Sequence, residues 1–183
     1  NPKGLYDMGL ICEEDYKSNI YDGTPYTADY EFAGKKRLEL LKKAFLNIND
    51  ELARQIKEFE ISNSWLTDYS VFMAVKVEEN MKPWWEWSDE HAHYFECIKD
   101  IYSYEKSAAF WKFVQFVFYK QWNEIKAYAN KKGVAVIGDM PIYVAMDSVD
   151  VWSNLPMFLI DEKTLKVEKV AGVPPDYFSK DGQ

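Results

Sequence analysis

The sequence has few of the residues that build metal centres and disulfide frameworks. It contains two cysteines, Cys12 and Cys97, and two histidines, His91 and His93, among 183 residues. The cysteines are too few and too far apart for the disulfide framework of a small secreted protein, which favours a reducing, cytoplasmic location. The histidines have an H-x-H spacing, but Ser88-Asp-Glu before them is typical of a helix N-terminus. Because no further Cys or His cluster completes a site, we expect no metal.

Long apolar runs and excess positive charge are also absent. No stretch approaches the ~20 apolar residues of a membrane-spanning helix, and no signal peptide is visible. The formal net charge is −8 and the isoelectric point is near 4.9, which argues against nucleic-acid backbones and anionic membranes as partners. A length of 183 residues suffices for one core with a small appendage. A complete (β/α)₈ barrel typically needs ~250 residues and cannot be present.

Aromatic residues are abundant, at 17% of the chain, with 7 tryptophans and 13 tyrosines. Their flat faces fill protein cores and also stack on sugar rings. Trp84, Trp85 and Trp87 fall within four residues and cannot share one helical face. One of them could therefore be exposed for stacking, or all three could pack at a seam between subdomains, which is the interpretation we favour.

The first half of the chain has a helical pattern. The first 30 residues, punctuated by Pro and Gly, predict irregular structure with one possible helical turn at 13–17. Apolar residues at three- and four-residue spacing then predict helices over 32–48, 50–59 and 65–79, the second of them capped by Asn49-Asp50. Three such helices with short breaks between them predict a helical subdomain.

A long aromatic helix and an apolar run organise the rest of the chain. The helix is predicted over 105–132, and large side chains on nearly every side indicate burial of most of its circumference. Gly133 then has the place of the residue that follows a helix C-cap. Residues 134–137, Val-Ala-Val-Ile between glycines, are typical of a strand buried on both faces in a parallel sheet. In β/α units, ligand chemistry lies beyond the carboxyl end of the strand, and Asp139 stands there.

Four carboxylates near or beyond this strand are candidates for chemistry. Asp139 follows a buried strand, where a carboxylate is costly unless something pairs with it, so it is a candidate ligand or substrate contact. Asp147 and Asp150 fit the N-cap and N3 positions of a short helix, and we favour that role for them. Asp176 adjoins two aromatic residues in a proline-stiffened loop. Glycosyl transfer with retention needs two carboxyl groups ~5–5.5 Å apart, which sequence spacing alone does not establish.

Two long blocks carry a resemblance to a known family. Residues 137–144 read Ile-Gly-Asp-Met-Pro-Ile-Tyr-Val and are followed at 147–152 by Asp-Ser-Val-Asp-Val-Trp. Residues 171–179 read Ala-Gly-Val-Pro-Pro-Asp-Tyr-Phe-Ser, with Gly-Gln at 182–183. Trp-Leu-Thr-Asp-Tyr at 65–69 and the motifs near 120–130 fit as well. On these motifs, which span most of the chain, the sequence resembles glycoside hydrolase family 77, the 4-alpha-glucanotransferases, also called amylomaltases or disproportionating enzymes.

The resemblance implies an α/β fold, as a mostly helical fragment of a (β/α)₈ TIM-barrel glycosidase. Residues 1–103 would form a helical insertion subdomain with an irregular N-terminal stretch, and 104–146 one barrel helix and strand. Residues 147–183 would form a small insertion hairpin and the start of the active-site loop, since 157–160 and 165–170 alternate around a polar turn. The implied activity is transfer of α-1,4-glucan segments between malto-oligosaccharides, by a retaining double displacement without a cofactor.

The resemblance also implies roles for four residues. Asp139 matches the family's Asp beside the sugar subsite nearest the cleaved bond, where its carboxylate would hydrogen-bond sugar hydroxyls. Tyr177 and Phe178, with Asp176 beside them, match the flexible loop that covers the donor and acceptor subsites. The family's nucleophile block, acid/base Glu and His-Asp pair have no counterpart in this sequence. We therefore expect a fragment with no catalytic residue and no activity on its own.

Two other functions fit parts of the sequence. The chain could belong to an α-amylase-like glucan hydrolase, or it could be a non-catalytic glucan-binding module that uses exposed tryptophans. The expected partners are malto-oligosaccharides and other α-1,4-glucans, with no nucleic acid and no membrane. Self-association is also expected, because a lone strand leaves both of its edges unpaired.

Overall fold

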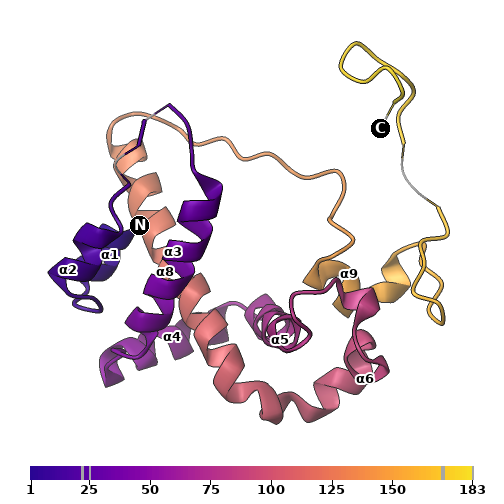
Figure 1. Cartoon of the computed structure of the whole chain (residues 1–183), viewed down its shortest axis with the longest axis horizontal. Helices are drawn as coiled ribbons and strands as arrows, with labels where there is room; N and C mark the ends of the chain where they lie inside the picture. The colour runs from indigo at the N-terminus through magenta and orange to yellow at the C-terminus, as the bar shows by residue number, and fades with distance from the viewer. Residues whose placement is uncertain (22, 25, 170–171, 183) are drawn as a thin grey trace. The chain divides into compact units, whose positions relative to one another are not determined.

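The chain is mostly helical (Figure 1). The computed structural model describes residues 1–21, 23–24, 26–169 and 172–182, and it contains no β-strand within them. The α-helices are α1 (Pro2–Asp7), α2 (Glu13–Ser18), α3 (Tyr30–Phe45), α4 (Asp50–Ser62), α5 (Trp65–Glu78), α6 (Asp89–Ala92), α7 (Tyr94–Cys97), α8 (Glu105–Lys131) and α9 (Val149–Ser153). Short 3-10 helices are η1 (Trp84–Glu86), η2 (Ile98–Tyr104) and η3 (Leu155–Met157).

The chain divides into two compact units. Unit 1 comprises Asn1–Ala74 and Tyr102–Asp139, and unit 2 comprises Val75–Ile101 and Met140–Gln183. The predicted division at residues 103 and 146 concerns the parts of a larger enzyme and stays a prediction.

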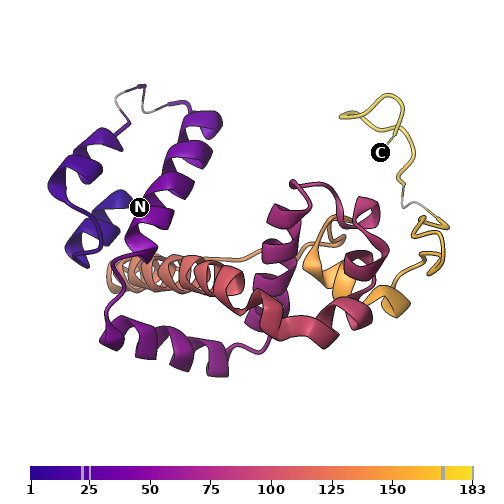
Figure 2. The ribbon, with the colours of Figure 1, turned by 60° about the horizontal axis from the view of Figure 1, so that its bottom comes forward.

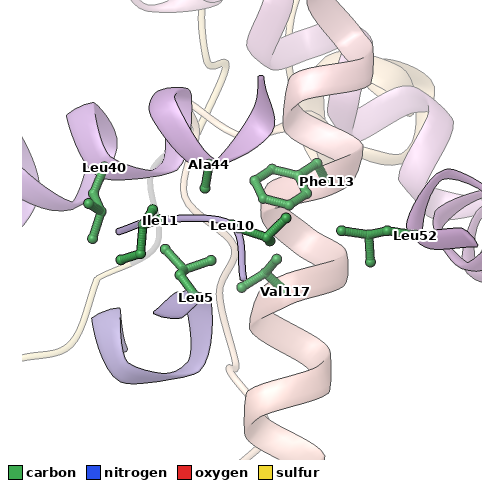
Figure 3. Packing of buried hydrophobic residues seen from close by; sticks show 8 residues of the cluster. All are labelled: Leu5, Leu10, Ile11, Leu40, Ala44, Leu52, Phe113 and Val117. Atoms are coloured by element: carbon green, nitrogen blue, oxygen red, sulfur yellow. The ribbon is translucent and has the colours of Figure 1, made fainter. Parts of the chain in front are cut away.

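The core of unit 1 lies where α1, α3, α4 and α8 meet (Figure 3). Phe113 and Val117, one turn apart on α8, are 0% and 4% exposed and form its centre. The same cluster includes Leu5 of α1, Ala44 of α3 and Leu52 of α4, together with Leu10, Ile11 and Leu40. Helix α4 runs beside α8, as Figure 2 shows. One face of α8, in the second segment of unit 1, thus packs against three helices of the first segment.

Local capping sets several helix ends as predicted. Asn49 is the N-cap of α4, and its side chain accepts a hydrogen bond from the Leu52 N–H at 2.9 Å. Gly133 follows the C-cap of α8 with φ +78°, a conformation that only glycine adopts without strain. The predicted helices over 32–48, 50–59, 65–79 and 105–132 correspond to α3, α4, α5 and α8, with ends that differ by up to three residues.

The prediction of irregular structure over the first 30 residues is wrong in part. Helix α1 begins at Pro2, and the Asn1 side chain accepts from the Lys3 N–H at 3.1 Å. Proline is well tolerated in the first turn of a helix, because its missing N–H would have no partner there. The proline that suggests a break therefore marks a helix start. Helix α2 lies where one helical turn was predicted, at 13–17.

The predicted strand at 134–137 is not formed. Val134 is 57% exposed and Ile137 is 92% exposed, so the run is not buried on either face. A strand needs a neighbour to pair its N–H and C=O groups, and the described part of the chain offers none. Exposed apolar side chains continue beyond the run at Met140 (84%) and Ile142 (89%).

Helix α8 is also less buried than predicted. Its buried residues are Ala108, Phe113 and Val117, all in the first half of the helix. Phe118 and Trp122 are 58% and 42% exposed, so the aromatic second half presents apolar surface to solvent. A helix with apolar residues on most sides needs neighbours on more than one face. Within unit 1, the buried residues of α8 face a single cluster.

The predicted β-hairpin is not confirmed. Ile160 and Val167 form one isolated antiparallel bridge. Asp161 closes the turn between them, since its side chain accepts from the N–H of Lys163 at 3.1 Å and of Thr164 at 2.7 Å. The turn is therefore present without flanking strands in the described residues.

In the described part of the chain, no helix is both long enough and apolar enough to cross a membrane. Cys12 is exposed and Cys97 is buried, and they form no disulfide in the described part of the chain.

Candidate functional site

Asp139 lies at the end of unit 1, in the irregular segment that follows α8. Its side chain is exposed and makes no hydrogen bond or ion pair with any residue that the structure describes. The carboxylate oxygens are therefore open to a ligand that offers hydroxyl donors.

Asp147 has a different role from the predicted helix cap. Ser148 is the N-cap of α9, and its side chain accepts from the Val151 N–H. Asp147 instead pairs with the ammonium group of Lys76, which lies in the same unit, near the C-terminal end of α5. The capping prediction is wrong because Ser148, directly after Asp147, caps the same helix, while the Asp147 carboxylate forms an ion pair with Lys76.

Lys76 is a functional candidate that the sequence interpretation missed. The residue is 9% exposed, and its ammonium also donates to the Lys82 carbonyl oxygen at 3.3 Å. The sequence does contain a signal for a buried, paired lysine, because Lys76 falls on the apolar face of the predicted third helix. A lysine among core positions needs a partner for its charge.

The tryptophan cluster packs inside unit 2. Trp84 and Trp87 are 0% and 6% exposed and Trp85 is half-buried, so the cluster packs as favoured, but within one unit, and the predicted seam between subdomains stays a prediction. The Trp84 indole N–H donates to the Met146 carbonyl oxygen at 2.7 Å. Trp152, 1% exposed, donates to the His91 carbonyl oxygen at 3.0 Å. Buried indoles thus join residues 84–91 to residues 146–152.

His91 belongs to a carboxylate contact. Its ring Nδ1 lies 2.6 Å from Glu79 Oε1, and because an ionised carboxylate only accepts, Nδ1 is the donor. Ser88 donates to the same oxygen through its N–H at 3.1 Å and its hydroxyl at 3.0 Å. The bond from His91 is the main cause that holds the pKa of Glu79 below its ordinary value. No cluster of three or more His, Cys, Asp or Glu side chains suited to a metal ion forms among the described residues.

The loop at 172–182 presents two aromatic rings. Tyr177 and Phe178 are 96% and 90% exposed, with ring centroids 5.6 Å apart and planes at 88°. Asp176 shapes the turn, because its Oδ1 accepts from the N–H of Phe178 at 2.8 Å and of Ser179 at 2.7 Å. These three predicted site residues lie together in unit 2, while Asp139 belongs to unit 1.

A cavity of about 660 Å³ in unit 2 links the two sequence blocks. Tyr143 and Val144 of the first block line it, together with Gly172 and Val173 of the second. The remaining lining is mainly apolar and includes Ile160 of the turn region. The backbone before Asp147 and the start of the aromatic loop therefore share one cavity.

Comparison with known proteins gives one family. The sequence model of glycoside hydrolase family 77, described as 4-alpha-glucanotransferase, matches residues 3–183. A 4-alpha-glucanotransferase of Clostridium butyricum is 37% identical over 98% of the chain. One from Aquifex aeolicus is 40% identical over the whole chain. The chain spans 37% of the length of each of these relatives.

A solved structure gives the same result for the fold. An amylomaltase from Streptococcus agalactiae, in complex with acarbose, matches 100% of this chain with a TM-score of 0.85 and 37% identity. The match covers 38% of that protein.

Proposed function

Since this chain belongs to the 4-alpha-glucanotransferase family, we propose that it supplies part of the glucan site of an enzyme that transfers α-1,4-glucan segments between malto-oligosaccharides. The relatives carry that activity in their names over proteins more than twice as long. The reaction would proceed with retention, by a double displacement whose nucleophile and acid/base lie outside these 183 residues.

The barrel interpretation belongs to the same proposal. Helix α8 and residues 134–139 would be one helix and one strand of a (β/α)₈ barrel, and the exposed apolar side chains of both would be covered by its other parts. The exposed Phe118 and Ile137 support this proposal, because apolar surface of this extent normally marks an interface.

We propose that four residues contact the glucan. Asp139 would accept hydrogen bonds from sugar hydroxyls, a use that its open carboxylate favours. Tyr177 and Phe178 would cover the bound chain with their faces, and Asp176 belongs to the same loop. Rings above a bound sugar exclude water, which favours a glucan acceptor over hydrolysis.

One structural observation carries the proposal beyond sequence similarity. The block that contains Asp139 and the block that contains Tyr177 and Phe178 line the same cavity, through Tyr143 and Val144 on one side and Gly172 and Val173 on the other. Residues of both blocks are therefore neighbours, as a shared substrate groove requires. No cofactor takes part in the proposed reaction.

The test is product analysis with the full-length protein that carries this chain, purified and incubated with maltotriose. A transferase releases glucose and also forms longer malto-oligosaccharides. Glucose and maltose alone, without longer chains, would mean an α-amylase-like hydrolase. Quenching of tryptophan fluorescence by maltoheptaose with no turnover would mean a non-catalytic glucan-binding module.

A further inference from the structure

Buried side chains of unit 2 hold one short backbone segment. Lys76 pairs with the Asp147 side chain, and the Trp84 indole donates to the Met146 carbonyl oxygen at 2.7 Å. The partners are separated by 71 and 62 residues in sequence. We call Lys76, Trp84, Met146 and Asp147 the Lys76 anchor.

The Lys76 anchor contributes more to the position of Met146 and Asp147 than to the stability of unit 2. Lys76 is 9% exposed, so its charge is largely removed from water. An apolar residue in such a place is often at least as stable as an ion pair. A buried ammonium is nevertheless directional, because it must meet Asp147 and the Lys82 carbonyl oxygen together. The Trp84 hydrogen bond fixes the adjacent peptide in the same way.

Met146 and Asp147 lie shortly after Asp139, the residue proposed to contact the glucan. Asp147 follows Asp139 by eight residues, and Tyr143 and Val144 between them line the cavity that Met146 also lines. Residues 140–145, the part of this segment that belongs to unit 2, have no regular secondary structure of their own. Their path in unit 2 therefore depends on where the anchor holds Met146 and Asp147.

We propose that Lys76 is a positioning residue for glucan transfer: through Asp147 it fixes the end of segment 139–147, and so the place at which this segment meets the sugar. The inference rests on the proposed function. Lys76 itself touches no reacting atom in this proposal. Misplacement of a substrate contact by about 1 Å lowers turnover by up to about a hundredfold, so the effect is expected in kcat.

The experiment compares two lysines in the full-length protein. Lys76→Met breaks the anchor. Lys112→Met breaks the ion pair of Lys112 with Glu60 in unit 1, where the side chains are 19% and 15% exposed and the distance is 2.5 Å. Both substitutions remove a largely buried charge, so general destabilisation affects both. Asp147→Asn is the second anchor variant, because Asp147 is 36% exposed and tolerates exchange more easily.

We expect Lys76→Met to lower kcat for maltotriose by about tenfold or more with KM changed less than about threefold, and Asp147→Asn to act in the same direction. Lys112→Met should stay within about twofold of the unsubstituted protein. Hydrogen exchange of residues 143–148 should become faster in the two anchor variants only. A kcat for Lys76→Met no lower than that of Lys112→Met, or unchanged exchange at 143–148, overturns the inference. An unsubstituted protein that fails to elongate maltotriose overturns the proposed function instead.

Discussion

The indole nitrogen of Trp84 donates to the carbonyl oxygen of Met146, 2.7 Å away and 62 residues later in the sequence. The whole Trp84 residue is 0% exposed, so this hydrogen bond is shielded from water. It ties the helical part of unit 2 to the irregular part. Trp84 thus has a structural role in connecting these two parts, and it is not an exposed ring available for stacking on a sugar.

Trp84→Phe should therefore destabilise unit 2. The substitution removes the indole donor and opens a small cavity, for a combined loss of about 1–3 kcal/mol. The Met146 carbonyl oxygen then keeps one donor, the Ser148 N–H at 3.0 Å. Trp85→Phe is the matched control, because Trp85 is only half-buried and its indole makes no hydrogen bond within the described residues. Urea denaturation of the chain, followed by circular dichroism, measures both. Equal denaturation midpoints for the two variants would show that the Trp84–Met146 hydrogen bond does not stabilise unit 2.

The core of unit 1 gives a second prediction, on a single helix. Phe113→Ala should lower the free energy of unfolding by about 3–5 kcal/mol, because the ring is 0% exposed at the centre of the cluster. Phe118→Ala, five residues along α8, removes the same ring from a side chain that is 58% exposed, and should cost less than about 0.5 kcal/mol. A similar loss for both variants would contradict the packing described for α8.

These helices also show what the sequence could predict. Asn49 and Gly133 act locally, so the start of α4 and the end of α8 follow from residues within one turn of each. Asp147 shows the limit of that reasoning, because the choice between Asp147 and Ser148 as cap depends on Lys76, 71 residues away. Proline at position 2 is ambiguous for another reason, since the same residue starts helices and breaks them.

The segment at 134–137 forms no strand because the described part of the chain offers no neighbouring strand for it to pair with. Its sequence pattern alone does not reveal this. Its β-branched composition is right for a buried strand, yet hydrogen bonds to a neighbouring strand make a strand. The resemblance identified the family because it used two whole blocks of sequence. The relation between Asp139 and the loop of Tyr177 and Phe178 follows from neither pattern nor resemblance alone, and stays a prediction.

The pH dependence of stability should show the Glu79–His91 contact. The pKa of Glu79 is lowered in the folded protein, mainly by the bond from His91. A lowered folded-state pKa means that its contribution to stability is fully present above the unfolded value of about 4.3 and is lost as the pH falls through the folded value. Glu79→Gln should therefore lose less stability between pH 6 and pH 3 than the unsubstituted chain.

Denaturation midpoints across that pH range check this prediction. Glu78→Gln is the control, because Glu78 is an exposed neighbour on α5. It should follow the pH profile of the unsubstituted chain. If Glu79→Gln has the same slope as Glu78→Gln, the contact does not stabilise the folded state.

Self-association of the 183-residue chain should depend on residues 134–144. Ile137 is 92% exposed in an unpaired apolar segment, which is the kind of surface that associates. Ile137→Lys should shift the chain toward monomer in analytical ultracentrifugation, at no cost to the core. Ile61→Lys exchanges another exposed isoleucine, 75% exposed near the end of α4, and should leave the distribution unchanged. The prediction fails if both variants behave alike, or if the unsubstituted chain is monomeric.

Glucan contact by Asp139 is tested most directly by the maltotriose transfer rate of two aspartate variants of the full-length protein. Asp139→Asn removes the charge of the open carboxylate, and a lost charged hydrogen bond to substrate lowers kcat/KM by about 10- to 100-fold. Asp150→Asn makes the same exchange at an exposed position in the first turn of α9 and should change kcat/KM by less than about twofold. A kcat/KM for Asp139→Asn equal to that of Asp150→Asn would contradict the account.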